Sequence, residues 1–152
     1  MEMATNKENV DYAAFIDTAD RIINFSVKLP DSWDRGNIHF KFYWTVSAAP
    51  TSGTTVMWGV KVCARGDNEA IDLAYGAETT QSDTYQTANY LHISDACRIL
   101  AANIGGATLS IGDLLTFSVR RVTASDDAAA SALLLGVALQ FNNSGNPGTW
   151  VV

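Results

Sequence analysis

Apolar and polar side chains alternate without a break through Ile38-His39-Phe40-Lys41-Phe42-Tyr43-Trp44-Thr45-Val46. Successive side chains of a β-strand point to opposite faces of a sheet, so every second residue of this stretch shares one face. One face carries aromatic bulk into a core, and the other meets water or a partner. We therefore predict a half-buried strand over 37–47, and a second sheet that covers its aromatic face.

Seven other segments have the alternation or the composition of strands, bounded by residues typical of turns. The loop 48–53 is short enough to join antiparallel neighbours, so we expect 37–47 and 55–65 to form a hairpin. At most a short helix is expected over 68–75. Short loops and the lack of a long helix predict an all-β fold, an antiparallel β-sandwich of jelly-roll type with about eight strands. The seven other segments are 21–28, 55–65, 79–84, 90–94, 107–111, 114–122 and 132–141.

The last predicted strand, 132–141, is almost continuously apolar, which is typical of a strand covered on both faces. We expect it at the centre of a sheet or at a subunit interface. Before the sandwich domain, 21–141, lies a mostly polar arm, 1–20, and after it a polar spacer with an apolar end, 142–152. The apolar residues of the arm and tail are candidate contacts with other subunits. They are Tyr12, Phe15 and Ile16 in the arm, and Trp150, Val151 and Val152 in the tail.

The composition excludes several classes of protein. The net charge is −6, and lysines and arginines are scattered, so nothing forms the basic stripe that nucleic-acid binding needs. No leader peptide or membrane span is apparent, which predicts synthesis and folding in a cytosol. Charged residues make up 17% of the chain and hydrophobic residues 47%, which leaves apolar surface for other chains to cover and favours oligomerisation.

Two motifs have ordinary structural explanations. Arg65-Gly66-Asp67 spells an integrin-adhesion tripeptide, but Gly-Asp after a strand is common turn chemistry. The aspartates do not follow the spacing of a calcium loop, so we predict no metal site. Asp126 and Asp127 would be the first choice if an ion bound.

The sequence predicts no enzyme and no cofactor. Ser94 and His92 fall on one short strand, and no nucleophile-elbow motif accompanies them, so a catalytic triad is not expected. Cys63 and Cys97 lack the spacing of a metal site and are predicted to be buried or half-buried free thiols rather than a disulfide.

The tryptophans divide into two groups. Trp44 and Trp58 are in phase with the inner faces of their strands, which predicts core packing. Trp33 and Trp150 are expected in a loop and in the tail. Trp33 is therefore a candidate glycan contact.

Several segments resemble a group of small β-rich proteins from the structural gene clusters of tailed bacteriophages. They are Leu29-Pro30-Asp31-Ser32-Trp33-Asp34-Arg35-Gly36, Phe40-Lys41-Phe42-Tyr43-Trp44-Thr45, Val56-Met57-Trp58-Gly59-Val60 and Leu133-Leu134-Leu135-Gly136-Val137-Ala138-Leu139-Gln140-Phe141. The resemblance covers roughly residues 12–141. It implies a jelly-roll virion protein that trimerises to decorate a capsid or to tip a fibre, and it assigns no site residue. The tail 142–152 departs from that pattern.

The leading hypothesis is a capsid decoration, or cement, protein that clamps the major capsid protein of a phage head as a homotrimer. It would bind by apolar burial and by strand addition from the arm or tail. Its location would be the capsid surface of the virion, after synthesis in the bacterial cytoplasm. The alternatives are a receptor- or glycan-binding fibre tip and a monomeric carbohydrate-binding module.

Overall fold

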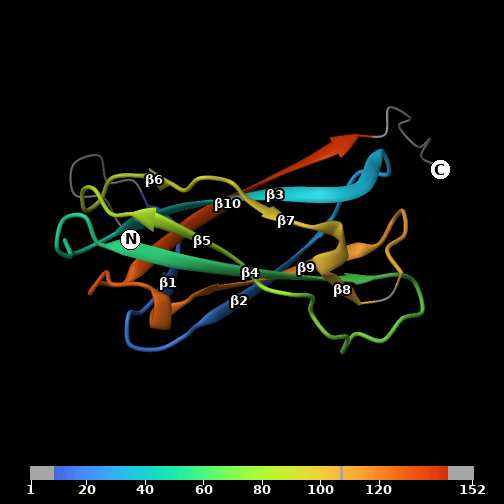
Figure 1. Ribbon diagram of the computed structural model, residues 1–152, viewed down its shortest axis with the longest axis horizontal. Coiled ribbons are helices and arrows are strands. Elements are labelled where there is room, and N and C mark those ends of the chain that lie inside the picture. Colours follow the sequence, from blue (N-terminus) through green and yellow to red (C-terminus); the bar gives the residue numbers. More distant parts are fainter. Residues whose placement is uncertain (1–8, 107, 144–152) are drawn as a thin grey trace.

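The computed structural model describes residues 9–106 and 108–143, which form two β-sheets packed face to face (Figure 1). Sheet I has the order β1-β10-β3-β6, with β7 also paired to β3. Sheet II has the order β2-β9-β4-β5, with β8 running parallel to β4. The predicted antiparallel β-sandwich is confirmed, with ten strands instead of about eight. The strands are β1 (Ala13–Phe15), β2 (Ile22–Lys28), β3 (Trp33–Val46), β4 (Thr55–Arg65), β5 (Thr79–Thr84), β6 (His92–Ile93), β7 (Cys97–Ile99), β8 (Ile104–Gly106), β9 (Leu114–Arg121) and β10 (Ala132–Asn143).

The predicted hairpin between 37–47 and 55–65 is wrong, because β3 and β4 lie in different sheets. β3 pairs with β10, and β4 pairs with β9 and β5. The matched aromatic faces of the two strands therefore meet across the sandwich rather than side by side. Apolar alternation identifies the inward faces of two strands, but it does not tell whether those strands are neighbours in one sheet or opposed in two.

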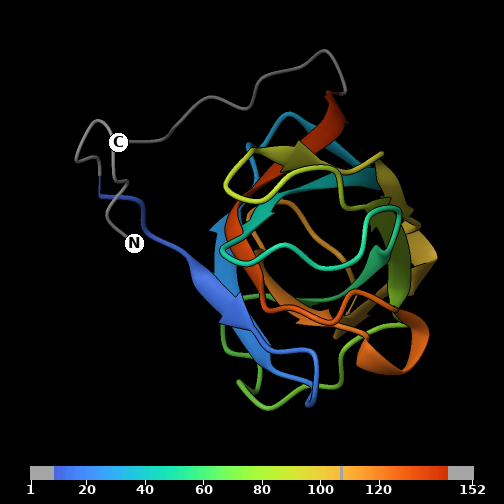
Figure 2. The ribbon, with the colours of Figure 1, turned by 90° about the vertical axis from the view of Figure 1, so that its left-hand side faces the viewer.

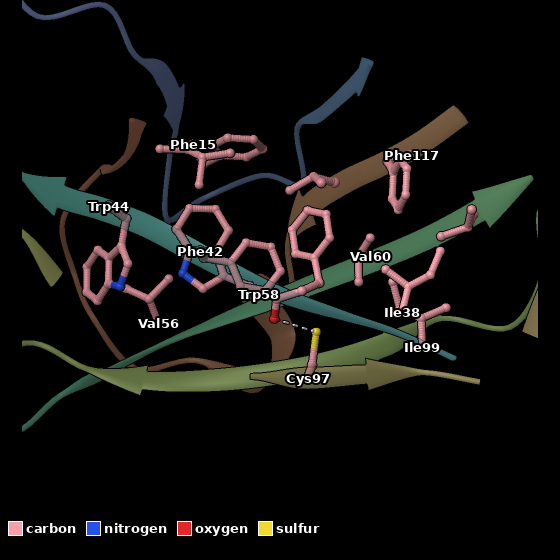
Figure 3. Packing of buried hydrophobic residues seen from close by; sticks show 14 of the residues in the cluster. Phe15, Ile38, Phe42, Trp44, Val56, Trp58, Val60, Cys97, Ile99 and Phe117 are labelled. Carbon is pink, nitrogen blue, oxygen red and sulfur yellow. Dashed lines mark hydrogen bonds between the residues drawn. The ribbon is translucent and has the colours of Figure 1, made fainter. Parts of the chain in front are cut away.

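Aromatic rings fill the space between the sheets (Figure 3). Phe42 of sheet I stacks on Trp58 of sheet II with ring centroids 5.3 Å apart, and Phe15 meets the edge of the same indole at 5.3 Å. Trp44 and Trp58 have no exposed surface, as their phase in the sequence predicts. Figure 2 shows the strands surrounding this core on all sides. Burial of such rings is the main stabilising contribution to the fold.

Between β4 and β9 the strand predicted over 107–111 is wrong, and the expectation of at most a short helix over 68–75 is met by a loop. Residues 68–75 contain no helix, and this loop is held to β4 by the hydrogen bond from Gly76 N to Val62 O, 3.0 Å. Residues 108–111 contain no strand, and residue 107 lies outside the described residues. The strand in this region is β8, where Gly105 and Gly106 let the backbone approach its neighbours; a Cβ at Gly105 would lie 2.3 Å from Ala74 O.

Part of the predicted arm belongs to the sandwich. β1 pairs antiparallel with the first three residues of β10, and Phe15 is buried in the core. β10 therefore lies between β1 and β3, in agreement with a place inside a sheet. No helix within 9–106 and 108–143 has the length and hydropathy needed to cross a bilayer.

A buried ion pair closes one end of the sandwich. Arg121, at the end of β9, has no exposed surface and forms a two-pronged contact with Asp126, including an Nη2–Oδ1 distance of 2.8 Å. Its guanidinium also donates to the carbonyl oxygens of Phe15, Ala128 and Ala130. These bonds tie β9, β1 and the loop before β10 together.

Candidate functional site

The outer face of sheet I carries an apolar surface across three strands. Tyr43 of β3 points outward, because its neighbours Phe42 and Trp44 face the core. In register with Tyr43 lie Ile93 of β6 on one side and Gly136 of β10 on the other. Ile93 is 48% exposed, so this part of the sheet presents apolar groups to solvent.

A hollow in this surface forms at an irregularity of β10. The register with β3 shifts between Leu134 and Gly136, which leaves Leu135 as an extra residue, as in a β-bulge. Apart from Gly136 itself and its two chain neighbours, no described residue has an atom within 4 Å of the position that a Cβ of Gly136 would occupy. The missing side chain therefore leaves open space above the sheet. The hollow is lined by Tyr43, Leu91, Leu135, Gly136, Val137 and Ala138.

A second apolar hollow lies beside the first and shares Leu135, Gly136 and Val137 with it. Its other walls come from residues 11–13 of the predicted arm and from Ile23 and Phe25 of β2. Tyr12 is 44% exposed at this place, whereas Ile16 is half-buried. β1 pairs with the edge of β10 along Ala132–Leu134, and residues 11–12 lie beside the next residues of β10.

Basic side chains adjoin the apolar surface. His39 and Lys41 of β3 point outward like Tyr43, and Arg98 of β7 lies opposite His39. Within the described part of the chain, neither Lys41 nor Arg98 forms an ion pair or a side-chain hydrogen bond. The face thus combines an uncharged hollow with a basic flank, in a chain whose net charge is −6.

The outer face of sheet II also exposes Ile22, by 60%, but several of its polar side chains bond one another. Ser26 Oγ lies 2.9 Å from Thr116 Oγ1, and Arg65 Nη1 donates to the same threonine at 2.7 Å. Arg120 donates one hydrogen bond to each carboxylate oxygen of Glu78, both at 2.7 Å. These hydrogen bonds hold the pKa of Glu78 below its usual value, against the opposing effect of burial.

The predicted contact residues have different positions. Phe15 is wholly buried and packs on Trp58, so in this fold its ring serves the core of its own chain, and the expectation of a subunit contact at Phe15 does not fit its position. Tyr12 reaches the surface beside β10. The predicted contacts Trp150, Val151 and Val152 lie outside the described residues.

The expectation that Trp33 is free in a loop is wrong. Trp33 is the first residue of β3, opposite Asn143 of β10, and is only 6% exposed. Its indole belongs to the hydrophobic cluster between the sheets. A buried ring cannot stack on a sugar, so the residue chosen as a candidate glycan contact is not available for that role.

The remaining polar candidates are occupied by structural bonds. His92 Nε2 accepts from the backbone N–H of Gln86 at 3.0 Å, with its ring stacked on Trp44. Ser94 Oγ accepts from Phe42 N at 3.0 Å and donates to the carbonyl of Asp95 at 2.8 Å. Neither side chain is directed at the other as in a nucleophile and base pair.

The acidic and sulfur ligand candidates are also accounted for. Asp126 holds Arg121, and Asp127 accepts from Thr55 N at 2.6 Å. Cys63 and Cys97 are buried free thiols, as predicted, and burial raises the pKa of Cys97 to about 11. Within 9–106 and 108–143, no group of three or more histidine, cysteine, aspartate or glutamate side chains is placed to hold a metal ion.

Sequence reasoning missed the hollow at Gly136. The signal that could have found it is the single glycine inside an otherwise continuous apolar strand, because a glycine there marks a bulge or a close approach by another group.

Comparison with protein-family models, with curated proteins and with solved structures finds no match to this chain.

Proposed function

We propose that this protein is a non-enzymatic structural subunit of a phage virion that decorates the head as a homotrimer. It binds neighbouring protein subunits through the outer face of sheet I. The observation that carries the proposal is the uncharged hollow around Gly136, with Tyr43, Leu91 and Leu135 at its walls. The centre of a protein–protein interface is depleted of charged residues and enriched in aromatic ones, and this surface has both properties.

The strand arrangement favours the same function. The first four strands, β1 to β4, alternate between the sheets, and the first strand lies beside the last. We interpret this order as a jelly roll, an architecture found in viral capsid and lectin domains.

The first experiment locates the protein in particles. Virions of the phage that encodes the chain are purified, heads and tails are separated, and both fractions are analysed by mass spectrometry. We expect the protein in the head fraction at a fixed ratio to the major capsid protein. Its presence only in tails would favour a fibre tip, and its absence from virions would contradict the proposal.

The second experiment assigns the binding face. Heads assembled without the protein are incubated with the wild type and with two variants, and occupancy is measured after sedimentation. Ala138→Glu places a charge beside the hollow on sheet I, and we expect it to reduce occupancy about tenfold or more. Asn24→Glu places the same charge on the exposed outer face of sheet II and should bind like the wild type. Equal occupancy of both variants would exclude the sheet I face.

A further inference from the structure

An exposed isoleucine stands on the loop that joins β4 to β5. Ile71 is 82% exposed, more than any other large hydrophobic residue of the described chain. Asp67 and Asp72 on the same loop are exposed, and neither has a hydrogen bond or an ion pair among the described residues. The loop therefore presents an apolar tip between free carboxylates.

The backbone of this tip is fixed. Arg65 Nε donates to the carbonyl oxygen of Ile71 at 2.7 Å, and Arg65 Nη1 is itself held by Thr116. Glu69 accepts from Gly66 N at 2.7 Å, which closes the turn that contains the Arg-Gly-Asp tripeptide. A single exposed isoleucine is common on protein surfaces. One that is held in place loses little conformational freedom on binding, which favours a role in recognition.

The chemistry of this loop complements the hollow on sheet I. The hollow over Gly136 is apolar and open, as an isoleucine side chain requires. Lys41 lies opposite Ala138 at the rim of the hollow, Arg98 lies farther along β3, opposite His39, and Asp11 lines the adjoining hollow. Among the described residues Lys41 and Arg98 have no acidic partners, and Asp67 and Asp72 beside Ile71 have no basic ones. One chain therefore carries both an apolar tip and an apolar hollow that could receive it. It also carries carboxylates beside the tip and cationic side chains on the face that holds the hollow.

The two surfaces cannot meet within one molecule. The hollow lies near the end of β3 that leads into β4, where β6 pairs with Tyr43 and Trp44. The Ile71 loop follows the opposite end of β4 and covers part of sheet II. Figures 1 and 2 show this loop, after β4, far from β6. A contact between these two surfaces therefore requires two copies of the chain.

We propose that the Ile71 loop of one copy docks into the Gly136 hollow of a second copy, with its aspartates beside Lys41 and Arg98. This inference rests on the proposed function and gives its self-assembly a defined contact. Because the two surfaces differ, the contact is heterologous, so copies form a closed ring, such as the proposed trimer, or an open chain.

Two substitutions at the proposed apolar contact and one control substitution test the docking. Light scattering on a sizing column, over a range of concentrations, measures the association of the wild type, Ile71→Asp and Gly136→Leu. We expect each variant to weaken association about tenfold or more, because one loses the tip and the other fills the hollow. Ile111→Asp changes another isoleucine, 59% exposed, and should associate like the wild type. Circular dichroism melting shows that each variant is folded.

A charge exchange tests the pairing itself. Lys41→Glu and Asp72→Lys should each weaken association, and the double variant should recover most of it, while Arg21→Glu with Asp72→Lys should not. A wild type that remains a 16.3 kDa monomer at its highest soluble concentration overturns the inference. So does unchanged association of Ile71→Asp and Gly136→Leu. The proposed function is tested separately, by mass spectrometry of purified virions, and absence of the protein from virions would contradict it.

Discussion

On the outer face of sheet II, serine, threonine and charged side chains bond one another, as in the network of Arg120, Glu78 and Asp20. On the outer face of sheet I, the centre has an apolar hollow, and its flanking cations have no acidic partners among the described residues. Both faces belong to one sandwich with one core, so folding alone does not explain the difference. A face that satisfies its own polar groups can remain in water, whereas an open apolar face gains free energy only when another molecule covers it.

The comparison predicts that substitutions on sheet II change folding stability, and that substitutions around the hollow change association. It can be tested along one strand, because adjacent arginines at the end of β9 point to opposite sides. Arg121 points into the interior, and Arg120 lies on the outer face of sheet II.

The largest effect is expected from Arg121→Met. The change leaves the carboxylate of Asp126, whose side chain is only 3% exposed, without its cation, and leaves three carbonyl oxygens without their donor. Removing one partner of a buried ion pair costs about 3–5 kcal/mol. Urea denaturation followed by circular dichroism measures the loss. A decrease within the error of that measurement would show that the pair does not stabilise this end of the sandwich.

A smaller loss is expected from Arg120→Met on the neighbouring residue. Its side chain is 25% exposed, so solvent screens its bonds to Glu78 and Asp20. We expect a loss of about 1 kcal/mol that shrinks as salt is added. Parallel urea titrations at low and high salt check this, with Lys28→Met, which removes an exposed pair with Asp31, as the matched control. A loss equal to that of Arg121→Met would contradict the assignment of Arg120 to a solvated face.

The pH dependence of stability should follow the same network. Hydrogen bonds from Arg120 and Thr123 lower the pKa values of Glu78 and Asp20 in the folded state. A lowered pKa contributes stability above the unfolded value, 4.5 for a glutamate, and this contribution is lost as the pH falls through the folded value. Unfolding free energy should therefore decrease below about pH 4.5. In Glu78→Gln the decrease should be shallower, and an unchanged acid profile would contradict this origin.

The sequence was sufficient for the longer strands, but it missed the three-residue strands β1, β7 and β8 and did not indicate which strands are neighbours. The bounds of β4 and β5 follow from local alternation and composition, because side-chain period is a local property. The pairing of β3 with β10 joins residues about a hundred positions apart, and no local signal encodes it. Trp33 was misplaced for a related reason: its turn-like surroundings predict a loop, but its pairing opposite Asn143 extends β3 and buries the ring.

The apolar strand β10 shows what a sequence can say about a site. Its continuous hydrophobicity indicated a covered strand, and β10 does lie inside sheet I. The hollow depends on the register shift at Leu135 and on the side chains that β3 and the β6 region bring to the same place. Those contributions come from three separate parts of the chain, so only the assembled sheet reveals them.

The smallest and most diagnostic change in stability is expected from Gly136→Ala. Apart from residue 136 and its two chain neighbours, the added methyl group meets no described atom within 4 Å, and glycine at this position has no positive φ that alanine would find strained. Reducing the freedom of the unfolded chain should then raise the free energy of unfolding by about 0.4–1 kcal/mol. Gly76→Ala is the contrasting control, because its methyl group would lie 1.8 Å from Asn103 O, and it should destabilise the protein. If urea denaturation shows a gain for Gly136→Ala while association weakens, the glycine lowers folding stability in order to keep the hollow open. A loss of stability would instead make Gly136 a requirement of the fold, and the contrast between the two faces would no longer point to a binding site there.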